Sequence, residues 1–408
     1  MTAAPGTGAP GTGAPRAVVV GAGIGGLAAA LGLQRGGWQV QVLERRTAAE
    51  AAAQPGSGIS IWPNGLRALA ALGVGEQVLA GAALAGGSGV RTPAGRWIAR
   101  TDIGGAVRDR FGLPLVITAR SRLAAALAGA LGPGLIEYGC PVDDVDTAAA
   151  AVRCGGQSLT AGLVVVADGA RSGLRGAVLG AVPRLHYAGY TSWRFTAPRP
   201  AGRAEPAETW GRGGQRFAIL PLDAGHVYCY ATAACPAGGH AADEREELSA
   251  RFSGWHAPIP GLLAALPPGA VIRTDISYLS DPPGAYHRGR AALLGDAAHA
   301  MTPDLGQGGC QALEDAATLA VLLPAAAAAG GGTERALAEY SRLRAPRAGG
   351  VARRSARAGR LYQAPLWLRG LAARASGAVP ARVAVRALAP VVSWDPPDGR
   401  QAGARDGR

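Results

Sequence analysis

The sequence contains no lysine, so all 41 of its basic residues are arginines. Set against 28 acidic residues, they give a formal net charge of +13. A strongly basic chain often binds nucleic acid or an acidic surface, but most of these arginines are scattered and no nucleic-acid-binding module accompanies them. We therefore expect no nucleic-acid partner and interpret the densest set as a solvated helix face. That set comprises Arg342, Arg344, Arg347, Arg353, Arg354, Arg357 and Arg360.

Cysteine and long hydrophobic runs are also scarce. The five cysteines form no C-x-x-C pair, which argues against a disulfide framework and a zinc site and fits a reducing cytoplasm. The apolar run from Leu319 to Ala329 is too short to span a membrane and predicts a buried helix. Residues 1–15 repeat APGTG without the apolar core of a signal peptide, so we expect a disordered tail. Together these features predict a cytoplasmic protein with no membrane span and no metal site.

Aromatic residues make up only 5% of the chain, but hydrophobic residues make up 48%, which supplies ample cores. The length of 408 residues allows about two domains, or one large domain with another inserted in it.

The stretch from Arg16 to Arg45 has the pattern of a nucleotide-binding βαβ unit. The apolar run Val18–Val20 predicts a buried parallel strand, and GAGIGG follows it directly, before a helix and a second strand that ends at Glu44. In such units the first glycine permits a tight turn, the second lets the backbone approach a pyrophosphate, and the third lets helix and strand pack closely. Glu44 stands where an acid accepts hydrogen bonds from an adenosine ribose. We therefore predict a dinucleotide site at this turn.

The following segment offers weaker candidates. Arg45 and Arg46 either reach a phosphate or adenosine, or form a solvent-exposed strand end. Residues 91–102 predict a hairpin. Arg120, at a strand-to-helix junction, either pairs with a phosphate or flavin, or lies on the surface.

Two later strands end in an acidic residue. The apolar run from Leu163 ends in Asp168-Gly169, and the run from Arg290 ends in Gly295-Asp296 and continues into a glycine-rich loop and a helix. Open α/β sheets bind ligands at the carboxyl ends of their strands, so both acids are binding candidates, although Asp168-Gly169 is also an ordinary turn sequence. We interpret His299 as a structural hydrogen-bonding residue and Cys310 as a packing residue.

Between residues 183 and 283 the pattern changes to short alternating strands separated by proline and glycine, which predicts an inserted antiparallel sheet. We expect this sheet to cover a substrate pocket. Because alternate residues of a strand face opposite ways, some of the lining candidates must point elsewhere. The candidates are Tyr190, Trp193, Arg194, Arg216, Phe217 and Tyr228.

These motifs together resemble those of the flavin-dependent aromatic hydroxylases, the single-component class A monooxygenases typified by para-hydroxybenzoate hydroxylase. The resemblance rests on GAGIGG with Glu44, on ADGARSGLR from Ala167, and on GDAAHAMTPDLGQGGCQALEDA from Gly295. It implies an α/β fold in which a Rossmann-type FAD-binding domain carries an inserted antiparallel substrate sheet and C-terminal helices. The implied domains are residues 16–182 with 284–350 for FAD, 183–283 for substrate and 351–408 as the helical segment.

The resemblance implies non-covalent FAD, with NAD(P)H as a transient reductant because no second GxGxxG motif is present. Arg120 matches a family arginine that contacts FAD, and Val142 matches a position whose backbone meets adenine. Asp296 would hold the ribityl chain. From the motifs and the resemblance together, we predict these cofactor-binding residues: Gly21, Gly23, Gly26, Glu44, Arg45, Arg120, Val142, Asp168, Asp296, Pro303, Gly306, Gly308 and Gly309.

The resemblance also implies a function, a monooxygenase that passes one oxygen atom of O₂ from a flavin C4a-hydroperoxide to an aromatic or other electron-rich small molecule. The chain departs from the family pattern at Asp304, where Asn is common, and at Cys229 and Tyr286-His287, where Trp is frequent. These departures leave the substrate open, and no catalytic base is assigned. The alternatives are a reductase or oxidase on the same fold and a redox-silent flavoprotein. We expect a monomer or a homodimer.

Overall fold

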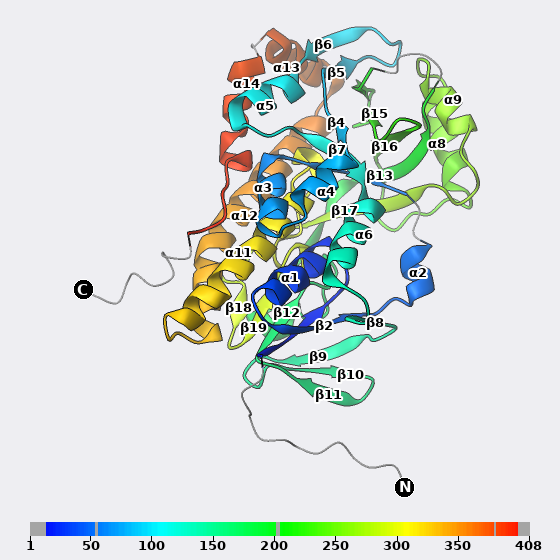
Figure 1. The fold of residues 1–408 in the computed structure, drawn as a ribbon. Coiled ribbons are helices and arrows are strands. Elements are labelled where there is room, and N and C mark those ends of the chain that lie inside the picture. The colour runs from blue at the N-terminus through cyan, green and yellow to red at the C-terminus, as the bar shows by residue number, and fades with distance from the viewer. Residues whose placement is uncertain (1–13, 54–55, 201–204, 379–380, 399–408) are drawn as a thin grey trace.

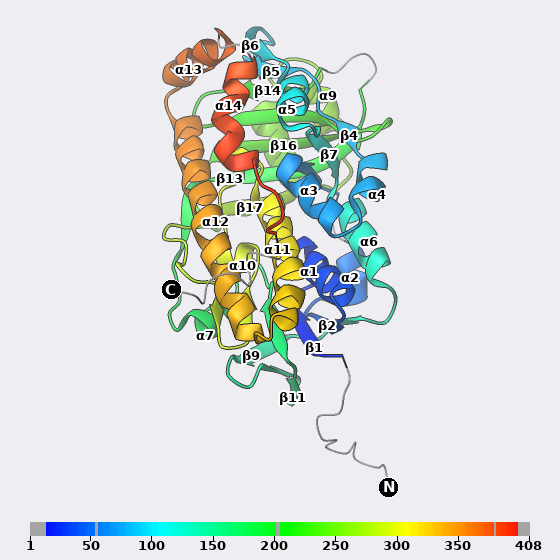
Figure 2. The same ribbon diagram turned by 60° about the vertical axis from the view of Figure 1, so that its left-hand side comes forward.

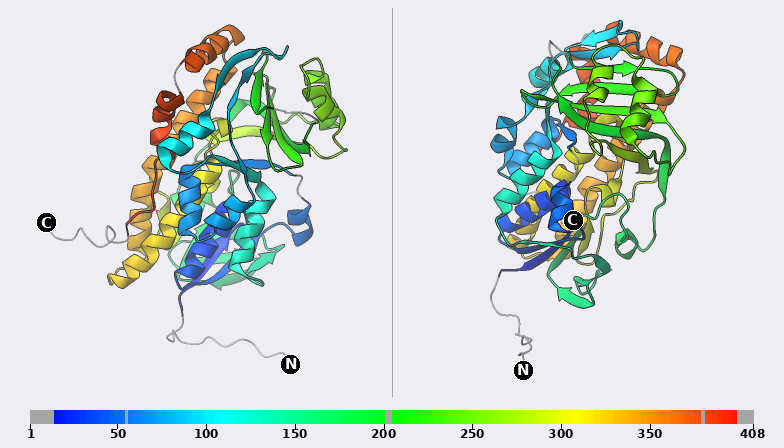
Figure 3. Two further views of the ribbon diagram at one scale, coloured as in Figure 1. Left: turned by 45° about the horizontal axis from the view of Figure 1, so that its top comes forward. Right: turned by 90° about the vertical axis from the view of Figure 1, so that its right-hand side faces the viewer.

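The computed structural model describes residues 14–53, 56–200, 205–378 and 381–398 (Figures 1 and 2). The predicted tail, residues 1–15, lies almost wholly outside these ranges. Two sheets dominate the rest, with a mostly parallel sheet near the N-terminal end of the molecule and a larger one at the other end (Figure 3), which is antiparallel except where β14 pairs in parallel with β5.

The first sheet has the strand order β18-β19-β12-β1-β2-β8. Its strands from β19 to β8 are all parallel, and only the edge strand β18 is antiparallel. Val18, Val19 and Val20 of β1 are buried, as are all four residues of β12, because helices cover both faces of the sheet. Its strands are β1 (Arg16–Val20), β2 (Gln39–Glu44), β8 (Ile136–Tyr138), β12 (Leu163–Val166), β18 (His287–Arg288) and β19 (Ala291–Leu293).

Two small sheets lie beside it. In the first, β7 (Val116–Ala119) pairs with β3 (Gly58–Ile61) and β4 (Ala83–Leu84). The second contains β9 (Val142–Asp146), β10 (Ala151–Cys154) and β11 (Gln157–Thr160). Cys140 and Cys154 are joined in a disulfide at the edge of this second sheet, with their Cα atoms 6.1 Å apart. The sequence analysis argued against a disulfide framework, and for this pair that expectation was wrong. An odd number of cysteines still allows one pair to form.

The large sheet has the order β17-β13-β16-β15-β14-β5-β6, and the predicted hairpin supplies its last two strands. It therefore takes strands from both sides of the domain boundary predicted at residue 183. Its strands are β5 (Ser88–Arg91), β6 (Trp97–Thr101), β13 (Leu185–Pro198), β14 (Ala207–Trp210), β15 (Arg216–Pro221), β16 (His226–Ala234) and β17 (Ile272–Leu279).

Helices cover the parallel sheet and run up to the large one. In the core, α1 packs against α6 and α11, and α11 packs against α3 and α12. The helices are α1 (Ile24–Arg35), α2 (Ala48–Ala52), α3 (Pro63–Ala71), α4 (Gly75–Ala80), α5 (Ile103–Phe111), α6 (Arg120–Leu131), α7 (Arg175–Leu179), α8 (Glu244–Phe252), α9 (Ile259–Ala264), α10 (Asp296–His299), η1 (Pro303–Leu305), α11 (Gly308–Ala328), α12 (Thr333–Gln363), α13 (Leu366–Ala378) and α14 (Ala381–Val392).

Among the described residues, α11 alone is long and apolar enough to cross a membrane. Most of it is buried inside the protein, between α1, α3 and α12. Its apolar character is therefore accounted for by packing in the core.

Candidate cofactor and substrate site

The glycines of the first turn have distinct surroundings. Gly21 has φ +103°, and a Cβ there would lie 2.5 Å from the carbonyl oxygen of Ala167. A Cβ on Gly26 would lie 1.9 Å from the carbonyl oxygen of Gly21, so the helix approaches the strand more closely than alanine permits. Among the described residues, no atom outside the turn itself lies within 4 Å of the ideal Cβ position of Gly23. The turn is thus closed on the sheet side and open at Gly23, as a pyrophosphate requires.

Glu44, at the end of β2, faces this turn. Its carboxylate is buried and accepts hydrogen bonds from the amide of Ala22 at 2.8 Å and from Nε of Arg46 at 2.9 Å. Burial alone would raise the pKa of Glu44, but the hydrogen bonds from Arg46 and Ala22 outweigh it and hold the pKa below its ordinary value. Arg46 is therefore the partner of Glu44, while Arg45 is exposed.

The chain segment just before β9 lies beside the end of β2. The amide of Cys140 donates to the carbonyl oxygen of Glu44 at 3.0 Å, and the amide of Gly139 donates to that of Arg46 at 2.9 Å. Val142 follows two residues later, so the structure brings this predicted residue near the acidic end of β2.

The two later acids stand at the ends of β12 and β19. Oδ1 of Asp168 is buried and has no hydrogen-bond partner among the described residues. Asp296 is exposed although the residues on either side of it are buried. Since β1, β12 and β19 are parallel neighbours, both carboxylates lie along the edge of the sheet that carries the Gly21–Gly26 turn.

Arg175 connects the ends of β12 and β19 through hydrogen bonds, and the sequence analysis did not identify it. Its buried guanidinium donates to the carbonyl oxygens of Ala297 at 2.6 Å, Ala170 at 2.8 Å and Asp296 at 3.2 Å. Buried backbone acceptors need such donors. Arg175 could have been identified from the sequence, because it is the last residue of the ADGARSGLR motif that begins at Ala167.

Arg120, the first residue of α6, lies within electrostatic range of Asp296, Arg194 and Tyr228. The side chain of Arg120 is solvent-exposed, yet the protein groups around it desolvate the guanidinium and lower its pKa; Asp296 opposes the shift, and the charge of Arg194 adds to it. Its amide donates to the carbonyl oxygen of Ser57 at 2.8 Å, which joins the start of α6 to the segment before β3. The structure therefore places Arg120 between the Asp296 loop and the large sheet.

A buried polar network supports the glycine-rich loop that follows α10. Asn64 donates to Gln307 at 2.9 Å and to Glu314 at 2.6 Å, which connects α3, the loop and α11. Arg344 of α12 pairs with both Glu314 and Asp315. The prediction that Arg344 lies on a solvated face was wrong, because two acids of α11 compensate its charge inside the core. The sequence analysis assigned no role to Glu314 or Asp315.

His299 and Cys310 have the structural roles predicted for them. His299 is fully buried and its Nε2 lies 2.7 Å from Oδ2 of Asp315. Cys310 is buried against Ser60 and Trp62, and burial raises the pKa of its thiol to about 12, so it remains protonated.

Asp304 connects the glycine-rich loop to the large sheet. Its buried carboxylate accepts hydrogen bonds from the hydroxyl of Tyr190 at 2.7 Å and from Nη2 of Arg216 at 2.8 Å. Glu208 lies 3.5 Å from the same guanidinium, which also stacks 4.3 Å above the ring of Tyr362. Burial opposes the charge on Arg216, but Glu208 and Asp304 outweigh it and raise its pKa. Arg216 is therefore a fully buried, charge-compensated cation.

The register of the large sheet sorts the predicted lining residues. Arg194 pairs with Tyr230, and Thr196 pairs with Tyr228, so these side chains share one face with Tyr190 and Arg216. Arg194 donates to Thr274 at 2.8 Å, and its buried Nε has no partner among the described residues. The ring of Tyr228 packs on Gly58, and burial raises its pKa to about 12.

Trp193 and Phe217 lie on the opposite face, so the prediction that they line the pocket was wrong. They pack in a core with Leu248 and Phe252 of α8, and Nε1 of Trp193 donates to Glu244 at 2.7 Å. Their apolar side chains match that core better than a polar cleft.

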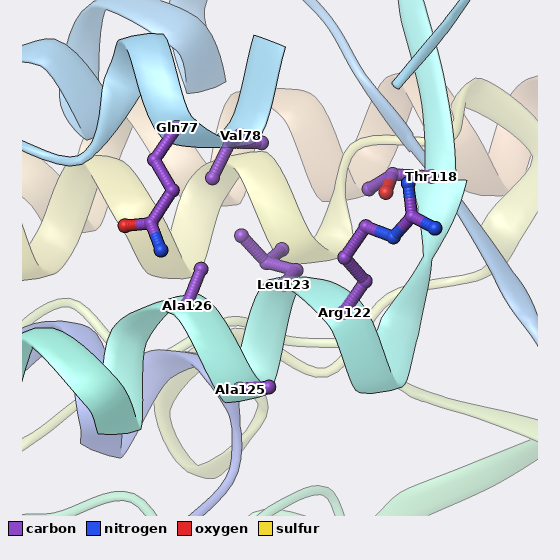
Figure 4. Close-up of a pocket in the computed structure, with 7 residues that line it drawn as sticks. All are labelled: Gln77, Val78, Thr118, Arg122, Leu123, Ala125 and Ala126. Carbon is purple, nitrogen blue, oxygen red and sulfur yellow. The ribbon is translucent and has the colours of Figure 1, made fainter. Parts of the chain in front are cut away.

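A pocket of about 240 Å³ lies between α4 and α6 (Figure 4). It contains none of the residues predicted to bind cofactor or substrate. Its lining residues are Gln77, Val78, Thr118, Arg122, Leu123, Ala125 and Ala126.

Comparison with known proteins agrees with this geometry. Residues 15–355 match the family model described as FAD binding domain. The chain is 38% identical over 352 residues to the aurachin C monooxygenase/isomerase of Stigmatella aurantiaca, and the matched region covers 85% of this chain and 89% of that protein. It is 35% identical over 324 residues to the FAD-dependent urate hydroxylase of Klebsiella pneumoniae, covering 74% of this chain and 80% of that protein.

The structure of Klebsiella pneumoniae HpxO complexed with FAD and uric acid superimposes with a TM-score of 0.82 at 29% identity, covering 93% of this chain and 96% of that one. The chain therefore belongs to the FAD binding domain family and has the para-hydroxybenzoate hydroxylase-like fold. It is an FAD-dependent monooxygenase. The predicted family, fold, cofactor and class of enzyme are thereby confirmed.

Proposed function

We propose that FAD binds in an extended conformation along the carboxyl ends of β1, β12 and β19. The observation that carries this is that three features meet along one sheet edge. They are the open turn at Gly23, the Oδ1 atom of Asp168, which has no hydrogen-bond partner among the described residues, and the exposed carboxylate of Asp296. A helix N-terminus at that edge favours an anion such as a pyrophosphate. These features fit the elongated, doubly phosphorylated cofactor that the family binds.

Each part of the site then has a role. Gly21, Gly23 and Gly26 hold the pyrophosphate, Glu44 holds the adenosine ribose, and Arg45 and the backbone at Val142 lie toward the adenosine end. Asp296 binds the ribityl hydroxyls with Arg120 nearby, and Asp168 belongs to the same edge. Pro303, Gly306, Gly308 and Gly309 present the backbone to the flavin ring.

The cofactor supplies the redox chemistry of the proposed reaction. Bound FAD supplies hydride acceptance from NAD(P)H and activation of O₂ for transfer of one oxygen atom. The protein holds the ring, excludes water and orients the substrate. We propose that Tyr190, Arg194, Arg216 and Tyr228 form the substrate wall, because they share the face of the large sheet that meets the Asp304 loop.

Two of the relatives are named for their substrates, urate and 3-amino-4-hydroxybenzoate. We propose a substrate of the same class, an aromatic or heteroaromatic small molecule. We further propose a cytoplasmic monomer or homodimer, in which residues 16–182 and 284–350 form most of the FAD-binding domain. Residues 183–283 form the substrate domain together with β5 and β6, which join its sheet. The helical segment predicted from residue 351 begins within α12.

The test is oxygen labelling of the FAD-loaded enzyme. A screen of phenols, urate-like heterocycles and polyketide aromatics identifies a compound that accelerates NADH or NADPH oxidation, and the reaction is then run under ¹⁸O₂. We expect one labelled oxygen atom in the product. Hydrogen peroxide with an unlabelled product would instead indicate an oxidase, and a flavin that NAD(P)H never bleaches would indicate a redox-silent protein.

A further inference from the structure

The C-terminal helices carry an unusual distribution of charge. Every charged residue from Ser341 to Ser393 is an arginine, so this stretch supplies much of the formal net charge of +13. Arg344, Arg347 and Arg369 are largely buried. The others are exposed, and they are Arg342, Arg353, Arg354, Arg357, Arg360, Arg374, Arg382 and Arg386.

Most of the large apolar side chains that are exposed among the described residues lie in the same stretch. Trp367 is 72% exposed, and Leu371 is 60% exposed. Leu361, Leu368 and Val383 are exposed as well. Exposed apolar side chains that occur singly need no explanation, but a group of them marks a surface with a partner.

Helical spacing places arginine and apolar residues on common faces. On α13, Trp367, Leu371 and Arg374 follow the spacing i, i+4, i+7 and therefore share one face. On α12, Arg353, Arg357 and Arg360 follow the same spacing, and Leu361 adjoins them.

The opposite faces of these helices are anchored to the protein. Arg369 is fully buried on α13, where it donates to the carbonyl oxygen of Gly211 at 3.0 Å and stacks 5.0 Å from the ring of Trp210. Val385 of α14 packs in a core with Val107 and Phe111 of α5. The exposed faces are therefore held outward by the fold. Figure 2 shows the end of α12 together with α13 and α14, in orange to red, at the end of the molecule away from the N-terminus.

We infer that this surface docks on an anionic lipid membrane. We call it the arginine–leucine surface and define it by Arg353, Arg354, Arg357, Arg360, Leu361, Trp367, Leu368, Leu371, Arg374, Arg382, Val383 and Arg386. This stretch contains no acidic residue to compensate its arginines, and anionic lipid headgroups supply that negative charge. The interfacial region of the bilayer accepts Trp and Leu side chains.

Charge and composition favour a membrane over the other partners. A second copy of the chain would bring two wholly cationic faces together without an acid in either stretch, which like charges oppose. Nucleic acid would compensate the arginines but would leave Leu361, Leu371 and Val383 in water, since its affinity rests on phosphate contacts. Only a lipid surface satisfies both kinds of side chain.

The experiment is sedimentation of the FAD-loaded, full-length protein with vesicles of phosphatidylcholine, alone or mixed with phosphatidylserine. We expect binding to the mixed vesicles alone, weakened by added salt. Trp367→Ser with Leu371→Ser, and separately Arg353→Gln with Arg357→Gln and Arg360→Gln, should each lower the affinity by about tenfold or more. Val182→Ser and Arg153→Gln replace an exposed apolar residue and an exposed arginine elsewhere, and should leave it unchanged.

Other outcomes would overturn the inference. Equal sedimentation with neutral and anionic vesicles, or none with either, would contradict it. So would a Trp367-dependent dimer in gel filtration without vesicle binding, or retention of a DNA duplex by the same arginines without vesicle binding. The flavin absorbance of each variant confirms that it is folded. The result does not depend on whether a substrate is hydroxylated.

Discussion

Asp304 is the residue whose removal tests the site most directly. Its carboxylate is fully buried and accepts hydrogen bonds from both Tyr190 and Arg216, and α12 closes on it through Gly359, where a Cβ would lie 2.5 Å from Oδ2. Asp304→Asn keeps an acceptor oxygen but removes one negative charge from a guanidinium that is only 4% exposed.

The magnitude follows from what remains after the change. Removing one partner of a buried ion pair costs about 3–5 kcal/mol when nothing replaces it. Here Glu208 still lies 3.5 Å from Arg216, and the Asn oxygen still accepts a hydrogen bond, so we expect a loss of about 2 kcal/mol in the free energy of unfolding. For a chain of 408 residues the corresponding fall in Tm is about 2 °C.

The assay is calorimetric unfolding of FAD-loaded wild type and variant at one fixed FAD concentration, since bound ligand raises Tm. Asp144→Asn is the matched control, because that carboxylate is 56% exposed and its loss should stay within about 0.5 kcal/mol. A second measurement adds 4-hydroxybenzoate or phenol. The benzoate should raise the Tm of Asp304→Asn more than that of wild type, because its carboxylate restores the missing charge beside Arg216, and phenol should not.

Two results would refute the reasoning. A variant as stable as wild type would mean that Asp304 is not the partner on which the buried Arg216 depends. An equal response of both proteins to 4-hydroxybenzoate would mean that Arg216 does not face the substrate space, and would remove it from the proposed wall.

Three further predictions follow from the same geometry. Gly26→Ala should abolish retention of FAD through gel filtration, because its Cβ would lie 1.9 Å from the Gly21 oxygen. The control for a glycine change is Gly129→Ala, at an exposed position of α6 with no positive φ and no described atom within 4 Å of the new Cβ. The ionised Glu44 contributes stability above its ordinary pKa of 4.5, which is lost as pH falls through its lowered folded pKa; Glu44→Gln should flatten that acid limb in pH-dependent unfolding. Trp193→Phe should lower Tm through the loss of its hydrogen bond to Oε2 of Glu244 and should leave KM unchanged; a raised KM would indicate that Trp193 does line the pocket.

Local sequence patterns predicted the first strand, the glycine turn and the acids at the strand ends well. The turn from Gly21 to Gly26 is built from residues adjacent in the chain, and the physical demands on each glycine are local ones, namely a positive φ, an open side and a close approach. The acids at Glu44, Asp168 and Asp296 were likewise identifiable, because each ends an apolar strand and parallel strands end at one sheet edge.

Pairings between distant segments were not predictable in the same way. Asp304 and Arg216 are 88 residues apart, and their contact depends on how the large sheet lies over the glycine-rich loop. The faces of Trp193 and Arg194 depend on strand register, since a shift of one residue exchanges every side chain between faces. The sequence showed that half of the candidates must face away, but only the pairing of β13 with β16 shows which half.

The arginines of α12 fall into two groups, one buried in the core and one exposed on the surface. Arg344 enters the core because Glu314 and Asp315 stand on the facing helix α11, and an unpaired guanidinium would be too costly there. Arg353, Arg357 and Arg360 find no acid within their own stretch and remain outside on the same helix. One face of α12 thus anchors α11 and the glycine-rich loop before it, and the other face presents cations. Loss of Arg344 should therefore impair folding and FAD binding, whereas loss of the outward arginines should impair only attachment to anionic vesicles. Comparing Arg344→Gln with the Arg353, Arg357 and Arg360 variants therefore separates the two roles on a single helix.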